Sequence, residues 1–96
     1  MATPTVTNNS AARQFEIDTG AGTALLRYVP EGDRIDLVHT EVPPQFQGNG
    51  YGEALVRAAL EYARREELKV VPSCPFVRRF ISKHREFGDL VAPPPS

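Results

Sequence analysis

Three glycines at alternating positions, Gly48, Gly50 and Gly52, come directly before a segment with the periodicity of an amphipathic helix. Because glycine lacks a side chain, consecutive backbone N–H groups there can turn toward one point. The first turn of the helix adds N–H groups without a partner inside the helix, together with the positive end of the helix dipole. This combination favours binding of an anion such as a phosphate or a diphosphate. A flexible connection between a strand and a helix is the alternative interpretation.

The spacing of these glycines excludes the two most familiar nucleotide-binding loops. A Walker loop has a lysine and then a serine or threonine after its last glycine, whereas Glu53 and Ala54 follow Gly52 here. A dinucleotide-binding loop has the pattern G-x-G-x-x-G and an acidic residue at the end of a strand about 20 residues later. This chain has G-x-G-x-G, and at that distance it is still completing a helix.

The single cysteine, Cys74, precedes Pro75, a residue that suits the first position of a helix. As the residue that caps this helix, Cys74 would have its thiolate stabilised by the helix dipole and by free N–H groups. The alternative is a small buried hydrophobic side chain. One cysteine also excludes an internal disulfide and a thiolate metal cage, and it indicates a cytoplasmic protein. No metal site is predicted.

The elements that would position these residues alternate between strand and helix periodicity. The pattern predicts strands over residues 13–18, 23–29 and 34–42, a helix from Tyr51 to about Glu67, a strand over 68–72 and a helix from Pro75. Strict alternation in the third strand would place on one face Ile35, Leu37, His39 and Glu41. The unit over residues 34–72 should leave its two strands parallel. If they splay apart, a crevice opens at their carboxyl ends, where the glycines and Cys74 would form one site.

The 96 residues predict one small domain over residues 13–91, with disordered tails over 1–12 and 92–96. The net charge of −1 argues against nucleic-acid binding through bulk charge. No apolar run approaches the roughly 20 residues that span a bilayer. The start of the chain lacks the basic and apolar regions of a signal peptide, so we expect no membrane partner.

The pattern Gln47-x-x-Gly50-x-Gly52, after a strand and at the start of a long helix, resembles the acyl-CoA loop of the GNAT acetyltransferases. "HTEVPPQFQGNGYGEALVRAALEYAR" followed by "LKVVPSCPFV" is similar to the compact GNAT-like branch, over about residues 13–91. The resemblance implies an α+β fold with a mixed, mostly antiparallel sheet, the order β-β-β-α-β-α, and helices packed on the sheet. It also implies acetyl-CoA as the cofactor and an amine, small or macromolecular, as the acceptor.

By this resemblance the loop binds the diphosphate of coenzyme A through Gln47, Gly48, Asn49, Gly50, Tyr51 and Gly52. The strand before the loop would pair its backbone at Glu41 and Val42 with the pantetheine arm, as an added strand would. The last helix could neutralise the adenosine phosphates with Arg78, Arg79, Lys83 and Arg85. A solvated helix face is the alternative role for these basic residues.

The candidate catalytic residues follow from a departure from the family pattern. Many relatives begin the last helix with an asparagine and carry a tyrosine seven residues later as the acid for the leaving thiolate, and here those places hold Cys74 and Ile81. Ile81 cannot donate a proton. Cys74 could accept the acyl group as a nucleophile or protonate the departing thiolate. His39 is a candidate base toward Cys74 or toward an incoming amine, and Glu41 is a second candidate. For His39 a structural role is the alternative, and we expect one for His84.

Three functions compete. The first is an acetyl-CoA-dependent N-acetyltransferase, with direct attack by the amine or transfer through Cys74. The second is a binding module for coenzyme A or acyl-CoA with weak catalysis, which the lost tyrosine favours. A short turn over residues 18–22, where larger relatives have acceptor-binding helices, favours it too. The third, a nucleic-acid-associated protein, finds little support in the overall charge. Exposed edge strands leave the oligomeric state open.

Overall fold

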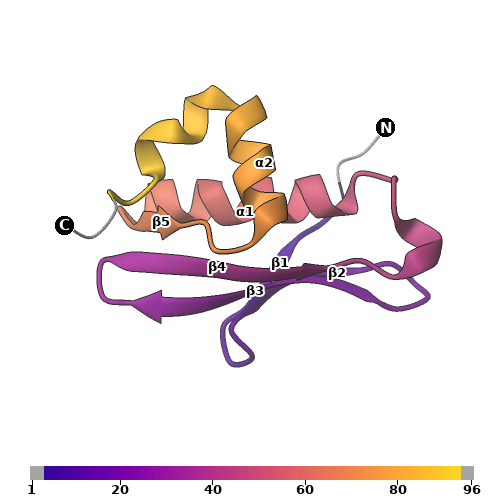
Figure 1. Ribbon diagram of the computed structural model, residues 1–96. Coiled ribbons are helices and arrows are strands. Elements are labelled where there is room, and N and C mark those ends of the chain that lie inside the picture. Colours follow the sequence, from indigo (N-terminus) through magenta and orange to yellow (C-terminus); the bar gives the residue numbers. More distant parts are fainter. Residues whose placement is uncertain (1–3, 94–96) are drawn as a thin grey trace.

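The order of the strands in the sheet follows their order in the chain, β1-β2-β3-β4-β5 (Figure 1). This computed structural model describes residues 4–93. The elements are β1 (Thr7–Asn9), β2 (Gln14–Asp18), β3 (Thr23–Glu31), β4 (Arg34–Glu41), the 3-10 helix η1 (Pro44–Phe46), α1 (Tyr51–Arg65), β5 (Lys69–Val71), α2 (Pro75–Lys83) and the 3-10 helix η2 (Arg85–Leu90). Strands β1 to β4 pair antiparallel and β5 joins β4 in parallel. The predicted α+β fold, with a mixed and mostly antiparallel sheet, is confirmed.

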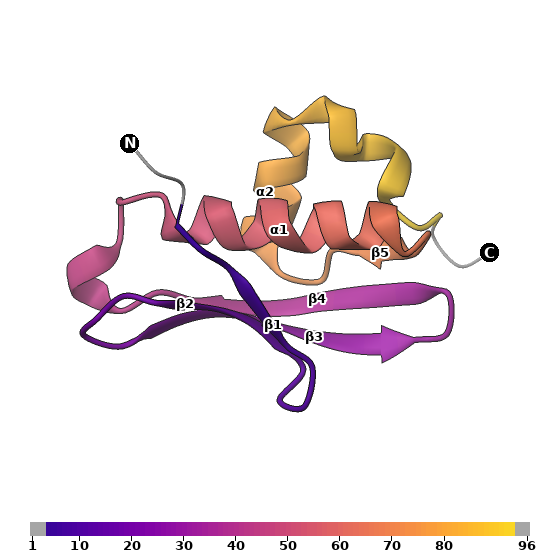
Figure 2. The same ribbon diagram turned by 180° about the vertical axis from the view of Figure 1, so that it is seen from behind.

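Both α-helices lie on one face of the sheet, and no helix of residues 4–93 covers the other face (Figures 1 and 2). Alternation along the strands explains this layering, because β2 and β3 bury on the helix side Phe15, Ile17, Ala24, Leu26 and Tyr28. Helix α1 packs on them through a stripe that is completely buried, namely Leu55, Val56, Ala59, Leu60 and Ala63. Burial of each large aliphatic side chain contributes about 1.5–3 kcal/mol, so detaching α1 from the sheet would be strongly unfavourable.

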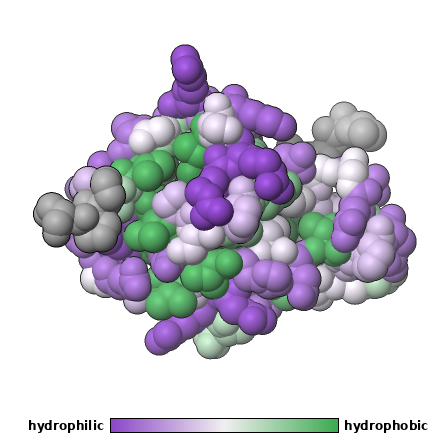
Figure 3. All heavy atoms as spheres, in the orientation of Figure 1, coloured by the Kyte–Doolittle hydropathy of each residue, from purple (hydrophilic) through white to green (hydrophobic). Residues whose placement is uncertain are grey.

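The surface is polar over most of the face seen in Figure 3, where apolar side chains form separate groups among polar ones. Among residues 4–93, the one exposed large hydrophobic side chain is Val29 of β3, at 39% exposure. In the same range, no helix has both the length and the apolar character needed to cross a membrane.

A bulge in β4 shifts the alternation of its side chains. Tyr28 of β3 lies opposite Leu37, and Arg27 lies opposite His39, so Val38 is an extra residue on β4. Past an extra residue, each side chain points to the face opposite the one that strict alternation would give it. The change therefore affects every residue of β4 that follows.

The register with β3 shows which face each later residue of β4 takes, because directly opposed residues of antiparallel strands share a face. Thr40 lies opposite Leu26, which is buried beneath the helices. His39 lies opposite Arg27, which is exposed, and Glu41 lies opposite the half-buried Leu25 on the same uncovered face. The expectation that His39 and Glu41 share a face with the buried start of β4 was wrong, because the bulge turns them to the uncovered face.

Both ends of the described chain join the sheet. Residues 7–9, which we expected in a disordered tail, form β1, where Asn8 pairs with Phe15 and accepts a 2.8 Å hydrogen bond from the Tyr28 hydroxyl. After η2, Val91 makes a parallel bridge with Val70, and the segment lies along the outer edge of β5. The remainder of the predicted tails at residues 1–3 and 94–96 lies outside the described residues.

Candidate functional site

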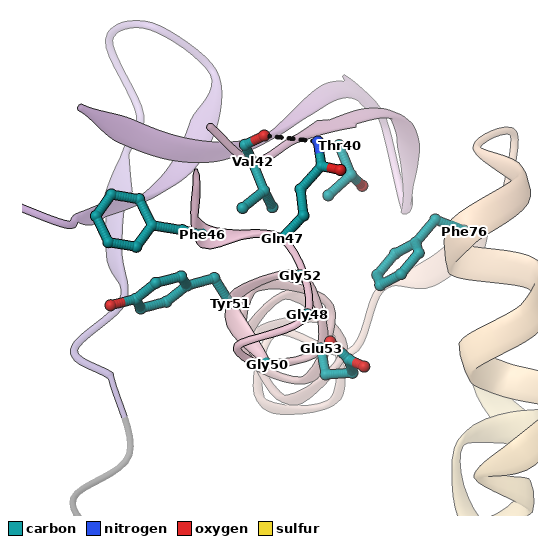
Figure 4. Close-up of a pocket in the computed structure, with 10 residues that line it drawn as sticks. All are labelled: Thr40, Val42, Phe46, Gln47, Gly48, Gly50, Tyr51, Gly52, Glu53 and Phe76. Carbon is teal, nitrogen blue, oxygen red and sulfur yellow. Dashed lines mark hydrogen bonds between the residues drawn. The ribbon is translucent and has the colours of Figure 1, made fainter. Parts of the chain in front are cut away.

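A pocket of about 300 Å³ opens where β4 and β5 separate. The two strands pair only as far as Asp36 and Val71, and the next link is a 2.9 Å hydrogen bond from the Cys74 N–H to the Leu37 carbonyl. Beyond that link, Thr40 and Val42 of the β4 segment line the pocket together with Phe76 of α2. The rest of the lining comes from the loop before α1 and from its first turn: Phe46, Gln47, Gly48, Gly50, Tyr51, Gly52 and Glu53 (Figure 4). The predicted crevice at the carboxyl ends of splayed strands is thus present.

Two of the three glycines allow the loop to turn. Gly48 and Gly50 have φ values of +89° and +84°, a conformation that other residues rarely adopt. Gly50 is the residue before α1, and the first helical hydrogen bond runs from the Ala54 N–H to its carbonyl at 3.0 Å. The N–H groups of Tyr51, Gly52 and Glu53 precede that bond, and no side chain caps the helix. The mouth of α1 therefore presents N–H donors to the pocket.

The rest of the loop is held by its own contacts. Gln47 Nε2 donates to the Val42 carbonyl at 3.2 Å, which fastens the loop to the end of β4 (Figure 4). The N–H of Asn49 donates to the Phe46 carbonyl at 3.2 Å, and Asn49 does not line the pocket. Of the six residues predicted to bind the cofactor in this loop, Gln47 and Asn49 thus already use their backbone N–H groups within the loop, Gln47 toward the Pro44 carbonyl at 3.3 Å.

Gly52 has a different role from the other two glycines. It lies within α1, and a Cβ atom there would stand 2.8 Å from Cζ of Phe76. Contacts below 3.0 Å do not occur for real Cβ atoms, so the absence of a side chain lets the first turn of α1 pack on the Phe76 ring. Gly52 therefore sets the distance between the mouths of the two helices.

Cys74 caps α2, as predicted, with its side chain nearly buried at 6% exposure. Its Sγ lies 3.6 Å from Thr40 Oγ1. Burial raises the pKa of the Cys74 thiol, but hydrogen bonding by Thr40 and by the N–H groups of Val77 and Phe76 outweighs burial, so the pKa lies below its usual 9.0. The two N–H groups act on the thiolate without a full capping hydrogen bond to the sulfur. Cys74 does not itself line the pocket, but its surroundings shift the thiol toward the nucleophilic thiolate.

His39 and Glu41 lie together but apart from this sulfur. His39 Nε2 is 3.3 Å from Glu41 Oε1, and their side chains are 54% and 66% exposed on the uncovered face. Cys74 and Thr40 lie on the helix side of the sheet, so the structure does not bring His39 to Cys74. A role for either residue toward an amine that reaches the uncovered face stays a prediction.

The basic residues of the last helix divide into two groups. Arg79 and Lys83 line a hollow of about 120 Å³ that shares Glu53 and Phe76 with the main pocket. Arg78 instead donates to the carbonyls of Pro72 and Ser73, at 3.0 and 2.8 Å, and so braces the turn before α2. His84 stacks on Phe80 at 4.1 Å between ring centroids, which agrees with a structural role.

Four residues that line the pocket were missed from the sequence, namely Thr40, Phe46, Glu53 and Phe76. Thr40 was not singled out, because the strand was taken to alternate strictly, whereas the bulge that turns Thr40 toward Cys74 depends on pairing with β3. Phe46 and Phe76 form walls of the pocket but were not among the predicted site residues. Glu53 was used as evidence against a Walker loop and was not assigned to the site. Within residues 4–93, no group of three or more His, Cys, Asp or Glu side chains could hold a metal ion.

Comparisons with known proteins agree with this geometry. The family described as GCN5-related N-acetyl-transferase matches residues 14–90. Protein NATD1 of Mus musculus is 33% identical over 82 residues, which cover 82% of this chain and 74% of that protein. For Protein NATD1 of Homo sapiens the identity is also 33%, over 82% of this chain and 73% of that protein. An NMR structure of a Staphylococcus aureus protein described as GCN5-like superposes with a TM-score of 0.73 at 26% identity, over 99% of this chain and 94% of that one.

Proposed function

This chain belongs to the GCN5-related N-acetyltransferase family, and from that premise we propose that it binds acetyl-CoA and transfers the acetyl group to an amine. One observation carries the proposal: the unpaired N–H donors at the mouth of α1 adjoin the splayed edge of β4 in one pocket. A diphosphate needs the first feature, and an extended amide-bearing arm needs the second.

The residues of the pocket fit such a ligand. Gly48 and Gly50 have open space where a Cβ would be, so their backbone can approach a diphosphate closely. The edge of β4 at Glu41 and Val42 would pair with the pantetheine arm. The Glu53 carboxylate would repel an anion in the same pocket. The positive charges of Arg79 and Lys83, in the adjoining hollow, would offset this repulsion. The ligand supplies an activated acetyl group, and the chain supplies position and proton transfer.

Direct transfer is the simpler reaction. A neutral amine attacks the thioester carbonyl, the new C–N bond forms, the C–S bond breaks, and coenzyme A leaves as a thiolate that takes up a proton. The attacking amine must also lose a proton, and the His39–Glu41 pair on the uncovered face would accept it. In the variant through Cys74, its thiolate attacks first, acetyl-Cys74 forms as coenzyme A leaves, and the amine then takes the acetyl group from the cysteine.

A coenzyme A-binding module with weak catalysis is the second candidate, because β2 and β3 are joined only by a tight turn. Within it, the Thr19 N–H donates to the Gly22 carbonyl at 3.0 Å, so no acceptor-binding helix is present between these strands. Ile81, which offers no proton to a leaving thiolate, favours the same candidate.

Two measurements on the full chain test the proposal. In an NMR titration, saturating coenzyme A should move the amide resonances of Gly48 through Gly52, and unmoved resonances would overturn the proposal. In the second, the protein is incubated with acetyl-CoA and a panel of amines while free thiol release and intact protein mass are followed.

Turnover with an amine supports the transferase, whereas saturable binding without thiol release above background supports the binding module. An acetyl mass on the wild type that is absent from Cys74→Ala would support transfer through the cysteine. Turnover that Cys74→Ala leaves unchanged would support direct attack.

A further inference from the structure

Thr40 and Cys74 come from different elements and meet through their side chains. Thr40 Oγ1 on β4 lies 3.6 Å from Cys74 Sγ at the start of α2. We propose that Thr40 is a positioning residue for Cys74, whose hydroxyl fixes the sulfur beside the pocket and stabilises its thiolate, a role that deepens the proposed function and rests on it.

The backbone holds both side chains in this arrangement. The extra residue Val38 turns Thr40 to the helix side of the sheet, where its side chain lines the pocket. The Cys74 N–H donates to the Leu37 carbonyl at 2.9 Å, and this hydrogen bond holds the N-cap residue of α2 against β4. Two features of the backbone, the bulge at Val38 and the hydrogen bond from Cys74 to Leu37, therefore hold Thr40 and Cys74 next to each other.

A hydroxyl suits both protonation states of the sulfur. Toward the thiol, Thr40 can accept from S–H, and toward the thiolate it donates its own O–H. Hydrogen bonds to an ionised acceptor are roughly twice as strong as neutral ones, so the contact favours the thiolate. Thr40 is the largest of the interactions that lower the pKa of Cys74, ahead of the backbone N–H groups of Val77 and Phe76.

None of the interactions that shift this pKa comes from a charged side chain. On β4, His39 and Glu41 lie on the uncovered face and contact each other. On α2, Arg78 uses its guanidinium on the carbonyls of Pro72 and Ser73. Neutral hydrogen-bond donors therefore stabilise the Cys74 thiolate, as a neighbouring imidazolium does in many reactive cysteines. A cysteine whose thiolate is stabilised in this way depends less on a neighbouring base at the moment of attack.

The test is a pH titration of the ultraviolet absorbance of the thiolate in the full chain without acetyl-CoA. Cys74 is the single cysteine, and a Cys74→Ser protein corrects for the three tyrosines. Thr40→Val keeps the shape and removes the donor, and should raise the pKa of Cys74 by about one unit, which leaves about tenfold less thiolate at neutral pH. Thr40→Ser keeps the hydroxyl and should stay close to the wild type. Thr23→Val on β3 is the matched control and should leave the pKa unchanged.

Thermal unfolding is followed for each protein, and Thr40→Ala replaces Thr40→Val if the valine variant does not fold. A pKa that rises without the hydroxyl and returns with serine supports the proposal. A pKa that is the same in all variants overturns it, and so does an equal rise in the serine and valine variants, which would show that packing and not the hydroxyl matters. The titration needs no cofactor, so its outcome is independent of whether the chain binds acetyl-CoA.

Discussion

The Phe76 ring occupies the space that a side chain at position 52 would need. The ideal Cβ at Gly52 lies 2.8 Å from Phe76 Cζ and 3.0 Å from Phe76 Cε2, both atoms of a rigid ring that also lines the pocket. Glycine within a helix costs about 1 kcal/mol relative to alanine. The backbone of Gly52 is helical and does not require a positive φ. The close approach of the two helices therefore explains why glycine stands at position 52.

Gly52→Ala should therefore weaken coenzyme A binding although the N–H of residue 52 is kept. The added methyl group displaces Phe76 toward the pocket, and overpacking of this kind costs about 1–3 kcal/mol, which exceeds the gain in helix propensity. Calorimetric titration with coenzyme A measures the loss of affinity, and urea denaturation measures the change in stability. Gly88→Ala is the control, because nothing lies within 4 Å of the Cβ position there. If Gly52→Ala binds as tightly as the wild type, and the double variant with Phe76→Leu does not differ from it, the ring contact does not shape the pocket.

At the scale of elements, the β4 bulge marks the limit of what sequence pattern could predict. Hydrophobic periodicity located β2, β3, β4, α1 and α2, because each has enough apolar residues to define its period. In "RIDLVHTEV" the apolar residues change from odd positions, Ile35 and Leu37, to even positions, Val38 and Val42, but the pairing that makes Val38 extra is with β3 and is not contained in this segment. The bulge depends on pairing with β3, a non-local interaction. For that reason the glycine loop itself was predictable, whereas the partner of Cys74 was not.

The short strand β1 escaped prediction for a related reason. Its three residues, Thr7–Asn9, carry no hydrophobic period of their own. Their order comes from pairing with β2 and from the Tyr28–Asn8 hydrogen bond, both contacts with residues distant in the chain. A strand that depends on its neighbours in this way cannot be recognised from local composition.

Helix α2 presents Arg79 and Lys83 four residues apart, and both line the hollow next to the main pocket. If the adenosine end of coenzyme A reaches this hollow, the double variant Arg79→Gln, Lys83→Gln should bind coenzyme A several-fold more weakly, because two exposed cations each contribute at most about 1 kcal/mol. It should bind dephospho-coenzyme A almost as tightly as the wild type does. The wild-type preference for coenzyme A should also decrease as salt screens the charges.

Arg85→Gln is the matched control, since it removes a cation of the same basic run from η2 outside the hollow. Calorimetric titrations of both ligands with all three proteins give the comparison. An equal loss of affinity for both ligands in the double variant would show that the two cations do not interact with the phosphate that distinguishes them.

At the scale of the whole molecule, the position of the site depends on a short stretch of pairing between β5 and β4. Strand β5 pairs with β4 through only three residues, and its outer edge is supported by the segment after η2. Lys69 Nζ also donates to the Asp89 carbonyl at 2.9 Å, which holds this segment near the start of β5. Because Cys74 follows β5 after a two-residue turn, the position of the sulfur depends on contacts made by the end of the described chain.

Ala92→Pro tests this dependence, because it removes the N–H that donates to the Val70 carbonyl at 2.8 Å. Val91 has φ −66° and ψ 128°, a conformation that a following proline favours, so the change should not strain that residue. The loss of the hydrogen bond should lower the free energy of unfolding by about 1 kcal/mol in urea denaturation. Ala92→Ser keeps the donor and should match the wild type. The Cys74 amide should exchange its hydrogen faster in the proline variant, because β5 and the turn to α2 lose their outer support. Unchanged exchange at Cys74 together with lowered stability would mean that the hydrogen bond to Leu37 alone holds the cysteine in place.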